Sequence, residues 1–176
     1  MKLLLVLFSL FIISTNLFAH EQEDRLRGVI LERISQFITY NEAKDEFIIC
    51  IYDNKDMNKE FQKLYNGRKY KNLPIKVKSI KSISKIMGCD ILYIGNTNKK
   101  IIKQIVKQTQ PYTLLVTDDI NFLDENFMLA LYVEGSKINF AINHKALIDA
   151  NLKVNYRLLK VASKVLNPIK NEYEKK

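Results

Sequence analysis

Two histidines and a pair of adjacent aspartates are the side chains of this sequence best suited to metal or acid–base chemistry. Asp118 and Asp119 follow an apolar run typical of a buried strand, and open α/β folds bind ligands at the carboxyl ends of their strands. Two neighbouring carboxylates could hold a cation, or they could simply end the strand in a turn. His20 and His144 lie far apart in the chain, so they could bind a metal together only if the fold brings them close. The alternative is that His144 is a solvent-exposed residue at the start of a helix. Phosphate-binding glycine loops and paired nucleophile and base residues are not readable, so we predict a protein that is not an enzyme and uses no cofactor.

The start of the chain has the pattern of a secretory signal. Lys2 is followed by an apolar run, Leu3 to Ile13, interrupted by a single serine, and a short polar stretch then leads to Ala19. As a helix the apolar run would rise about 16 Å, roughly half the thickness of the hydrocarbon core. We therefore expect residues 1–19 to be a signal peptide cleaved after Ala19, which leaves a soluble protein in the periplasm. An uncleaved amino-terminal anchor is the alternative.

The two cysteines, Cys50 and Cys89, fall within or at the start of apolar runs typical of buried strands. Export would place them in an oxidising compartment, and neighbouring strands would bring them within bonding range. We expect a structural disulfide between them. Two buried, unpaired thiols are the alternative.

The hydrophobic pattern predicts a single α/β domain over residues 20–167, followed by a charged tail at 168–176. Strand and helix patterns alternate, which favours a Rossmann-like, mostly parallel sheet with helices on both faces. Two strands that flank Gly135 predict a terminal antiparallel hairpin, and Asn143 and Asn155 can each cap a helix. The last of these helices is expected to include Ala162 and Val165. The expected strands are 47–52, 75–80, 89–94, 112–117, 128–133 and 137–142, and the expected helices are 23–40, 57–65, 82–87, 98–108, 143–150 and 155–167.

The charge of the chain is basic and unevenly distributed. The formal net charge is +9, and between Phe61 and Thr117 the only acidic residue is Asp90, against twelve lysines and arginines. Because we expect export, we do not expect a nucleic-acid partner; an acidic protein surface or an anionic membrane face would suit this charge. A lysine-coated solvent face is the alternative.

From Phe37 to Leu166 the chain resembles the YfiR family of periplasmic regulators. The most specific piece is the run from Lys137 to Leu166, and shorter pieces around Phe47–Tyr52, Gly67–Val77 and Cys89–Ile94 also match, with both cysteines. The chain departs from the family pattern in three places. Tyr40 stands where many members carry tryptophan, and residues 124–126 replace a glycine-rich step. A second cysteine pair that some members have is missing. The residues of the carboxyl-terminal run that fall on the family pattern are Phe140, Ile142, Asn143, Leu152, Lys153, Leu158, Leu159 and Ala162.

The resemblance implies a repressor that binds the periplasmic sensor domain of an inner-membrane diguanylate cyclase and lowers cyclic di-GMP and biofilm formation. It also implies an outer-membrane lipoprotein that sequesters the repressor, and a homodimer. We expect partner contacts from Leu152 and Tyr156 near the carboxyl-terminal helices, although both residues could instead pack in the core. The competing hypotheses are a small-ligand-binding protein that uses a crevice near Gly95 and Asp118, and a metal-dependent enzyme that uses the histidines or the aspartate pair.

Overall fold

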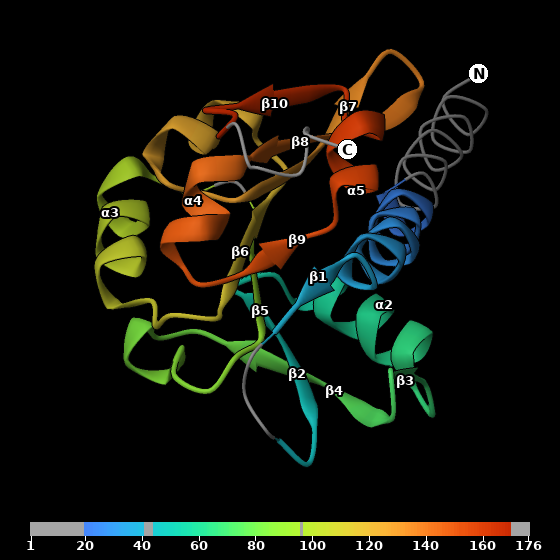
Figure 1. Cartoon of the computed structure of the whole chain (residues 1–176). Helices are drawn as coiled ribbons and strands as arrows, with labels where there is room; N and C mark the ends of the chain where they lie inside the picture. Colours follow the sequence, from blue (N-terminus) through green and yellow to red (C-terminus); the bar gives the residue numbers. More distant parts are fainter. Residues whose placement is uncertain (1–19, 41–43, 96, 170–176) are drawn as a thin grey trace, which may run out of the picture.

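The computed structural model describes residues 20–40, 44–95 and 97–169, so the expected signal peptide and most of the charged tail lie outside the described residues. The described chain forms an eight-stranded sheet with the strand order β10-β8-β7-β6-β5-β2-β4-β3 (Figure 1). The strands are β1 Ile38–Thr39, β2 Phe47–Tyr52, β3 Lys69–Tyr70, β4 Leu73–Ile80, β5 Ile91–Ile94, β6 Leu114–Thr117, β7 Leu129–Glu134, β8 Lys137–Asn143, β9 Lys153–Val154 and β10 Lys164–Leu166. The helices are a first helix at 20–35, α2 Lys55–Tyr65, α3 Lys99–Gln108, α4 His144–Asp149 and α5 Tyr156–Val161, with 3-10 turns η1 Ile83–Lys85 and η2 Ile120–Glu125.

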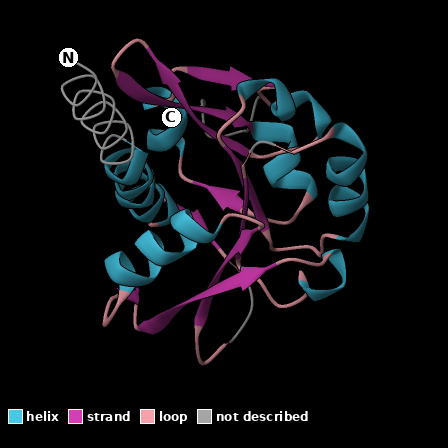
Figure 2. Ribbon diagram, turned by 180° about the vertical axis from the view of Figure 1, so that it is seen from behind, coloured by secondary structure: helices cyan, strands magenta, loops and turns pink. Residues whose placement is uncertain are grey.

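The centre of the sheet confirms the predicted α/β class. Strands β4, β2, β5, β6 and β7 run parallel, and the residues of β5 and β6 are buried throughout. Continuous apolar strands suit this position, because helices cover both faces of a parallel sheet. The first helix and α2 lie on one side of the sheet and α3 lies on the other (Figures 1 and 2). None of the helices in the described parts of the chain has the length and hydrophobicity needed to cross a membrane.

The end of the sheet differs from the prediction. The hairpin of β7 and β8 forms as expected, but β10 adds to β8 in parallel, so the antiparallel pair is not terminal. The last helix ends at Val161 rather than continuing past Val165, which lies in β10. Ser163 donates its backbone N–H to the Phe140 carbonyl at 2.9 Å, where the chain turns back toward the sheet. The unpaired edge of β8 offers backbone hydrogen bonds that outweigh the local helical spacing.

A second, two-stranded sheet was not predicted. Strand β1 pairs antiparallel with β9, and the backbone N–H of Asn155 donates to the Phe37 carbonyl at 2.8 Å. Strands of two residues are too short to show a hydrophobic period, which is why the pattern did not reveal them. The pairing ties the end of the first helix to the carboxyl-terminal segment.

The first helix packs closely against α2. A side chain at Gly28 would place its Cβ 2.6 Å from Leu64 Cδ2 and 3.1 Å from Phe61 Cε1, so a larger residue here would force these side chains to shift. The Tyr65 hydroxyl donates a hydrogen bond to the Gly28 carbonyl at 2.7 Å. The glycine therefore allows the first helix to approach α2 closely without displacing these side chains.

The two cysteines form the disulfide that was expected. Cys50 lies in β2 and Cys89 lies two residues before β5, the neighbouring strand, with their Cα atoms 5.8 Å apart. Both residues are buried. The bridge therefore lies in the core, where it links β2 to the segment that leads into β5.

Candidate interaction groove

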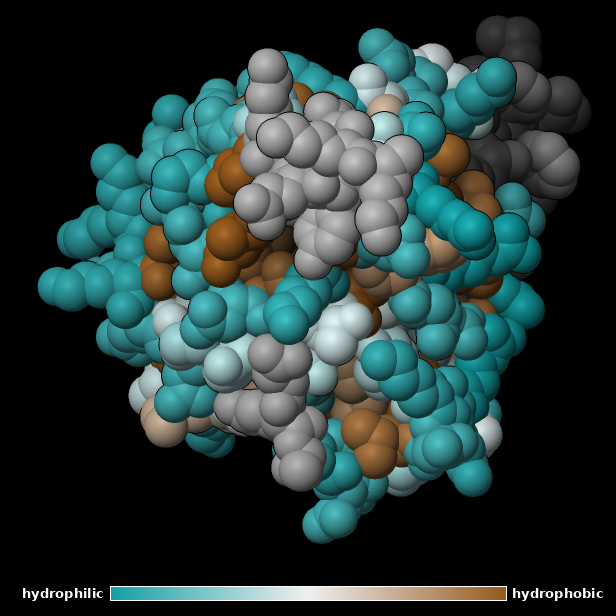
Figure 3. Space-filling model, viewed as in Figure 1, coloured by the Kyte–Doolittle hydropathy of each residue, from teal (hydrophilic) through white to brown (hydrophobic). Residues whose placement is uncertain are grey.

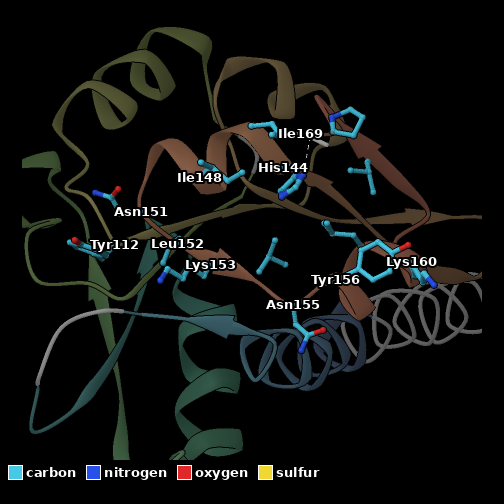
Figure 4. Close-up of a pocket in the computed structure, with 14 residues that line it drawn as sticks. Tyr112, His144, Ile148, Asn151, Leu152, Lys153, Asn155, Tyr156, Lys160 and Ile169 are labelled. Carbon is cyan, nitrogen blue, oxygen red and sulfur yellow. Dashed lines mark hydrogen bonds between the residues drawn. The ribbon is translucent and has the colours of Figure 1, made fainter. Parts of the chain in front are cut away.

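An apolar groove of about 830 Å³ is formed mostly by the carboxyl-terminal part of the chain. We call it the C-terminal groove. Helix α4 lines one side, α5 lines another, and β9 runs along the base (Figure 4), while hydrophobic surface is visible beside α4 and β9 in Figure 3. The lining residues are Tyr112, His144, Ile148, Asn151, Leu152, Lys153, Val154, Asn155, Tyr156, Leu159, Lys160, Val165, Pro168 and Ile169.

Asparagines set the ends of the elements around the groove. The Asn143 carbonyl oxygen Oδ1 accepts from the Ala146 N–H at 3.1 Å and caps α4, as the sequence predicted, while its Nδ2 donates to the buried Leu123 carbonyl at 2.9 Å. Asn151 has φ +59°, a left-handed conformation that asparagine tolerates, and it turns the chain from α4 toward β9. Asn155 Oδ1 accepts from the backbone N–H two residues later at 2.9 Å and begins α5. These caps confirm the predicted helix starts.

The position of His144 corrects the expectation of a solvent-exposed side chain, because this residue is 3 % exposed. Its Nδ1 accepts a hydrogen bond from the backbone N–H of Ile169 at 3.2 Å (Figure 4). Burial lowers the pKa of His144, which favours the neutral form that can accept this bond. This hydrogen bond therefore links the segment after β10 to the first residue of α4.

A metal site of the kind considered from the sequence is not assembled by the described residues. His20 begins the described part of the first helix and is exposed, near Asp24. Groups of three His, Cys, Asp or Glu side chains suited to a metal ion do not occur within residues 20–40, 44–95 and 97–169.

The rim of the groove carries positive charge and one exposed aromatic ring. Tyr156 is 49 % exposed, and Lys160 Nζ lies 4.6 Å from the centre of its ring, a cation–π arrangement. Ile148 and Ile169 are also partly exposed, at 37 % and 39 %. All charged residues between positions 150 and 169 are basic, namely Lys153, Arg157, Lys160 and Lys164. The groove thus combines an apolar lining with a cationic rim.

The two residues predicted as partner contacts have different positions. Leu152 is 1 % exposed, which agrees with the alternative of core packing rather than with a role as an exposed contact. It follows the turn at Asn151 and lies between the two expected helices, where the sequence offered no periodic pattern to show that it packs inward. Tyr156 is exposed on the groove and stays a predicted contact.

Most residues that carry the family pattern build the frame of the groove rather than its surface. Ile142, Asn143 and Leu158 are buried, whereas Lys153 is exposed. Phe140, Leu159 and Ala162 are partly buried against the core. The pattern therefore reflects packing and capping around the groove.

The adjacent aspartates have separate environments. Asp119 Oδ1 accepts from the Asn121 backbone N–H at 2.9 Å and caps η2, so this residue ends the strand in a turn. Asp118 lies close to Gly95, since a Cβ at that glycine would be 3.3 Å from Asp118 Oδ2, and burial raises the pKa of its carboxyl. Gly95 borders a smaller hollow of about 430 Å³ with residues of the β2–α2 turn, and Asp118 is not part of its lining.

A buried polar cluster under the first helix was missed by the sequence analysis. Arg27 is 6 % exposed; it forms ion pairs with Glu23 and with Asp24 and donates to the Leu131 carbonyl at 3.3 Å. Burial raises the pKa of Asp24, and it raises the pKa of the nearby Tyr93 hydroxyl as well. Asp24 and Arg27 share one face of the first helix with apolar residues, so the helical period alone did not separate them from solvent-exposed charges.

Together these elements form a small α/β domain with an apolar groove near its carboxyl-terminal helices. The YfiR/HmsC-like family model matches residues 24–163, and the chain belongs to this family. Its members are periplasmic regulators of diguanylate cyclase signalling, and they are regulatory rather than catalytic. The likeness derived from the sequence is therefore confirmed at the level of the family.

Other comparisons add information about the fold alone. Curated proteins gave no significant match. A conserved domain protein from Vibrio cholerae O1 biovar El Tor is 9 % identical with a TM-score of 0.55, over 81 % of this chain and 60 % of that one. The ABC domain from Streptococcus pneumonia, crystallised in complex with L-Trp, is 13 % identical with a TM-score of 0.50, over 69 % of this chain and 55 % of that one. The chain thus corresponds to little more than half of each of these longer structures.

Proposed function

We propose that this protein is a periplasmic repressor that binds the periplasmic sensor domain of an inner-membrane diguanylate cyclase and lowers cyclic di-GMP. Family membership supports the signalling role, and the C-terminal groove is the observation that supports a direct protein contact. Protein interfaces depend on a few aromatic or aliphatic anchors that lie in desolvated pockets. An apolar groove with one exposed tyrosine on its edge suits such an anchor.

The chemistry of the groove indicates the surface that the partner presents. Its lining is mostly apolar, and its rim includes Lys153 and Lys160 with no acidic side chain among the lining residues. The partner should therefore insert an apolar or aromatic side chain flanked by carboxylates. Complementary charge of this kind raises the association rate and makes it sensitive to salt.

The cellular test compares cyclic di-GMP in strains that carry different forms of the gene. Deletion should raise cyclic di-GMP, and the wild-type gene should restore the lower level. Tyr156→Ala should fail to restore it, whereas Val133→Ala, a similarly exposed site on the β7–β8 hairpin, should act like the wild type. Unchanged cyclic di-GMP in the deletion strain would contradict the repressor function.

Export and assembly belong to the same proposal. The mature chain should begin at His20 and be recovered from the periplasm, which amino-terminal sequencing tests; recovery of an intact Met1 in membranes would contradict it. Sequestration by an outer-membrane lipoprotein should appear when tagged mature protein is used to capture partners. A homodimer should appear in light scattering of the purified chain.

Capture of a small apolar ligand is the second candidate function. The volume of the C-terminal groove, about 830 Å³, falls within the range of small-molecule sites. The volume and apolar lining of the C-terminal groove support this groove as the binding site, in place of the crevice near Gly95 that the sequence suggested. Saturable binding of a small molecule by the purified chain, without binding to the sensor domain, would favour it.

A further inference from the structure

We propose that the exposed side of α3 is a binding surface for anionic lipid membranes. Lys99, Lys100, Lys103 and Lys107 project from this helix and are all exposed; we call them the lysine face. In Figure 3, hydrophilic side chains extend from the left edge of the molecule, where Figure 1 places α3. Lys103 follows Lys100 by three residues and Lys99 by four, and Lys107 follows Lys103 by four, so the lysines lie on one side of the helix. The opposite side of α3 holds the buried Ile102 and Ile105.

The lysine face keeps its charge available. In the described parts of the chain, no ion pair links any of these four lysines to an acidic side chain. The lysines and Gln104 border a shallow hollow of about 440 Å³ that has no acidic lining residue. The only acidic residue from Phe61 to Thr117, Asp90, is buried and paired with Lys44. Ammonium groups that form no ion pair favour a partner that offers many negative charges at once, and the acidic residues of η2, which also contacts α3, are Asp124 and Glu125.

The neighbouring turn extends the same chemistry. Helix α3 contacts η1, which carries the exposed Lys85, and Lys81 precedes it. Met87 follows η1 by two residues, and its side chain is 68 % exposed. An exposed thioether beside clustered lysines suits the boundary between lipid headgroups and acyl chains, where basic and apolar side chains bind together.

The shape of the surface favours a membrane over a folded protein partner. The helix is ten residues long, about 15 Å, and its exposed side carries lysines and glutamines with no aromatic anchor. Protein interfaces need packed anchors, whereas fluid headgroups rearrange around mobile lysine side chains. A membrane with anionic lipids would hold the protein at the surface, and this surface is separate from the residues that line the C-terminal groove.

The test is co-sedimentation of the chain from residue 20 to 176 with lipid vesicles. We expect binding to vesicles that contain about 30 % phosphatidylglycerol, loss of binding at high salt, and no binding to pure phosphatidylcholine. Each lysine near an anionic surface contributes about fivefold, so replacing the whole lysine face with glutamine should weaken binding on the order of a hundredfold or more. Met87→Ser should weaken it several-fold.

A control variant removes the same charge from exposed positions elsewhere. It should lose little affinity, because distant charges are screened. The control substitutions are Lys55→Gln, Lys59→Gln, Lys69→Gln and Lys137→Gln. Equal loss in both variants would show that net charge alone attracts the protein, and no binding to phosphatidylglycerol vesicles would exclude membrane binding; either result overturns the proposal. Neither variant changes the C-terminal groove, so this test is separate from that of the repressor function.

Discussion

Reduction of the disulfide should lower the free energy of unfolding by about 4 kcal/mol. Cys50 and Cys89 are 39 residues apart in the sequence, and the loop that they close contains α2, β3, β4 and η1. In the chain-entropy treatment, closing a loop of this length removes about 13 cal/mol/K from the unfolded chain, which is about 4 kcal/mol at 25 °C. Domains of this size are stable by about 5–15 kcal/mol, so the loss would be large.

Reduction keeps both sulfur atoms in place and removes only the bond, so it isolates the effect of the link. The double variant Cys50→Ala and Cys89→Ala should be slightly less stable than the reduced protein, because both sites are buried and the missing sulfur atoms leave small cavities. Urea unfolding followed by circular dichroism, with and without reductant, measures both differences. A change of less than about 1 kcal/mol on reduction, or two free thiols in unreduced protein, would refute the reasoning.

Three further changes test the packing, the capping and the pH dependence of the fold. Gly28→Ala should lower the free energy of unfolding by about 1–3 kcal/mol, because the new Cβ meets Leu64. An unchanged midpoint of thermal unfolding would contradict this, because it would show that the two helices accommodate the extra methyl group without cost. Asn143→Ala should cost about 2 kcal/mol, since it removes the α4 cap and leaves a buried carbonyl unpaired, and Asn143→Ser should recover part of the loss in urea unfolding. Because burial lowers the pKa of His144 in the folded protein, the unfolded chain takes up the proton first as the pH drops below about 6.5, and the free energy of unfolding should fall from that pH downward while the folded ring stays neutral and keeps its hydrogen bond from Ile169. His144→Gln should lack this pH-dependent component when urea midpoints are compared across the pH range.

The central sheet could be predicted because its signals are local. The apolar run Phe47–Tyr52 coincides with β2, and the strands around Gly135 form the expected hairpin. Asn143 and Asn155 cap helices where their positions indicated. In each case, a strand period or a capping side chain lies within a few residues of the structure that it specifies.

The remaining features depend on contacts between distant segments. Strand β10 pairs with the edge of β8, and β1 pairs with β9, which lies more than 100 residues later in the chain. Burial of His144 depends on the segment that returns to it at Ile169. Such long-range pairings leave no period in the sequence, and local helical spacing therefore extended the last helix too far.

The candidate site was only partly predictable for the same reason. The sequence indicated the carboxyl-terminal helices and Tyr156, but it also selected Leu152, which faces the core. The groove forms where α4, β9, α5 and the segment after β10 meet, and its lining comes from all of them. The packing of these segments against one another determines which side chains stay exposed. The hydrophobic period of a single helix does not.

The measurement that tests the repressor function most directly is binding of the purified chain from residue 20 to 176 to the isolated periplasmic sensor domain of the cyclase. Calorimetry should show a saturable complex. Tyr156→Ala should weaken it by about thirtyfold, the effect of losing an aromatic anchor, and Val133→Ala should leave it unchanged. No complex at micromolar concentrations, or equal affinity for the wild type and Tyr156→Ala, would contradict binding through the C-terminal groove.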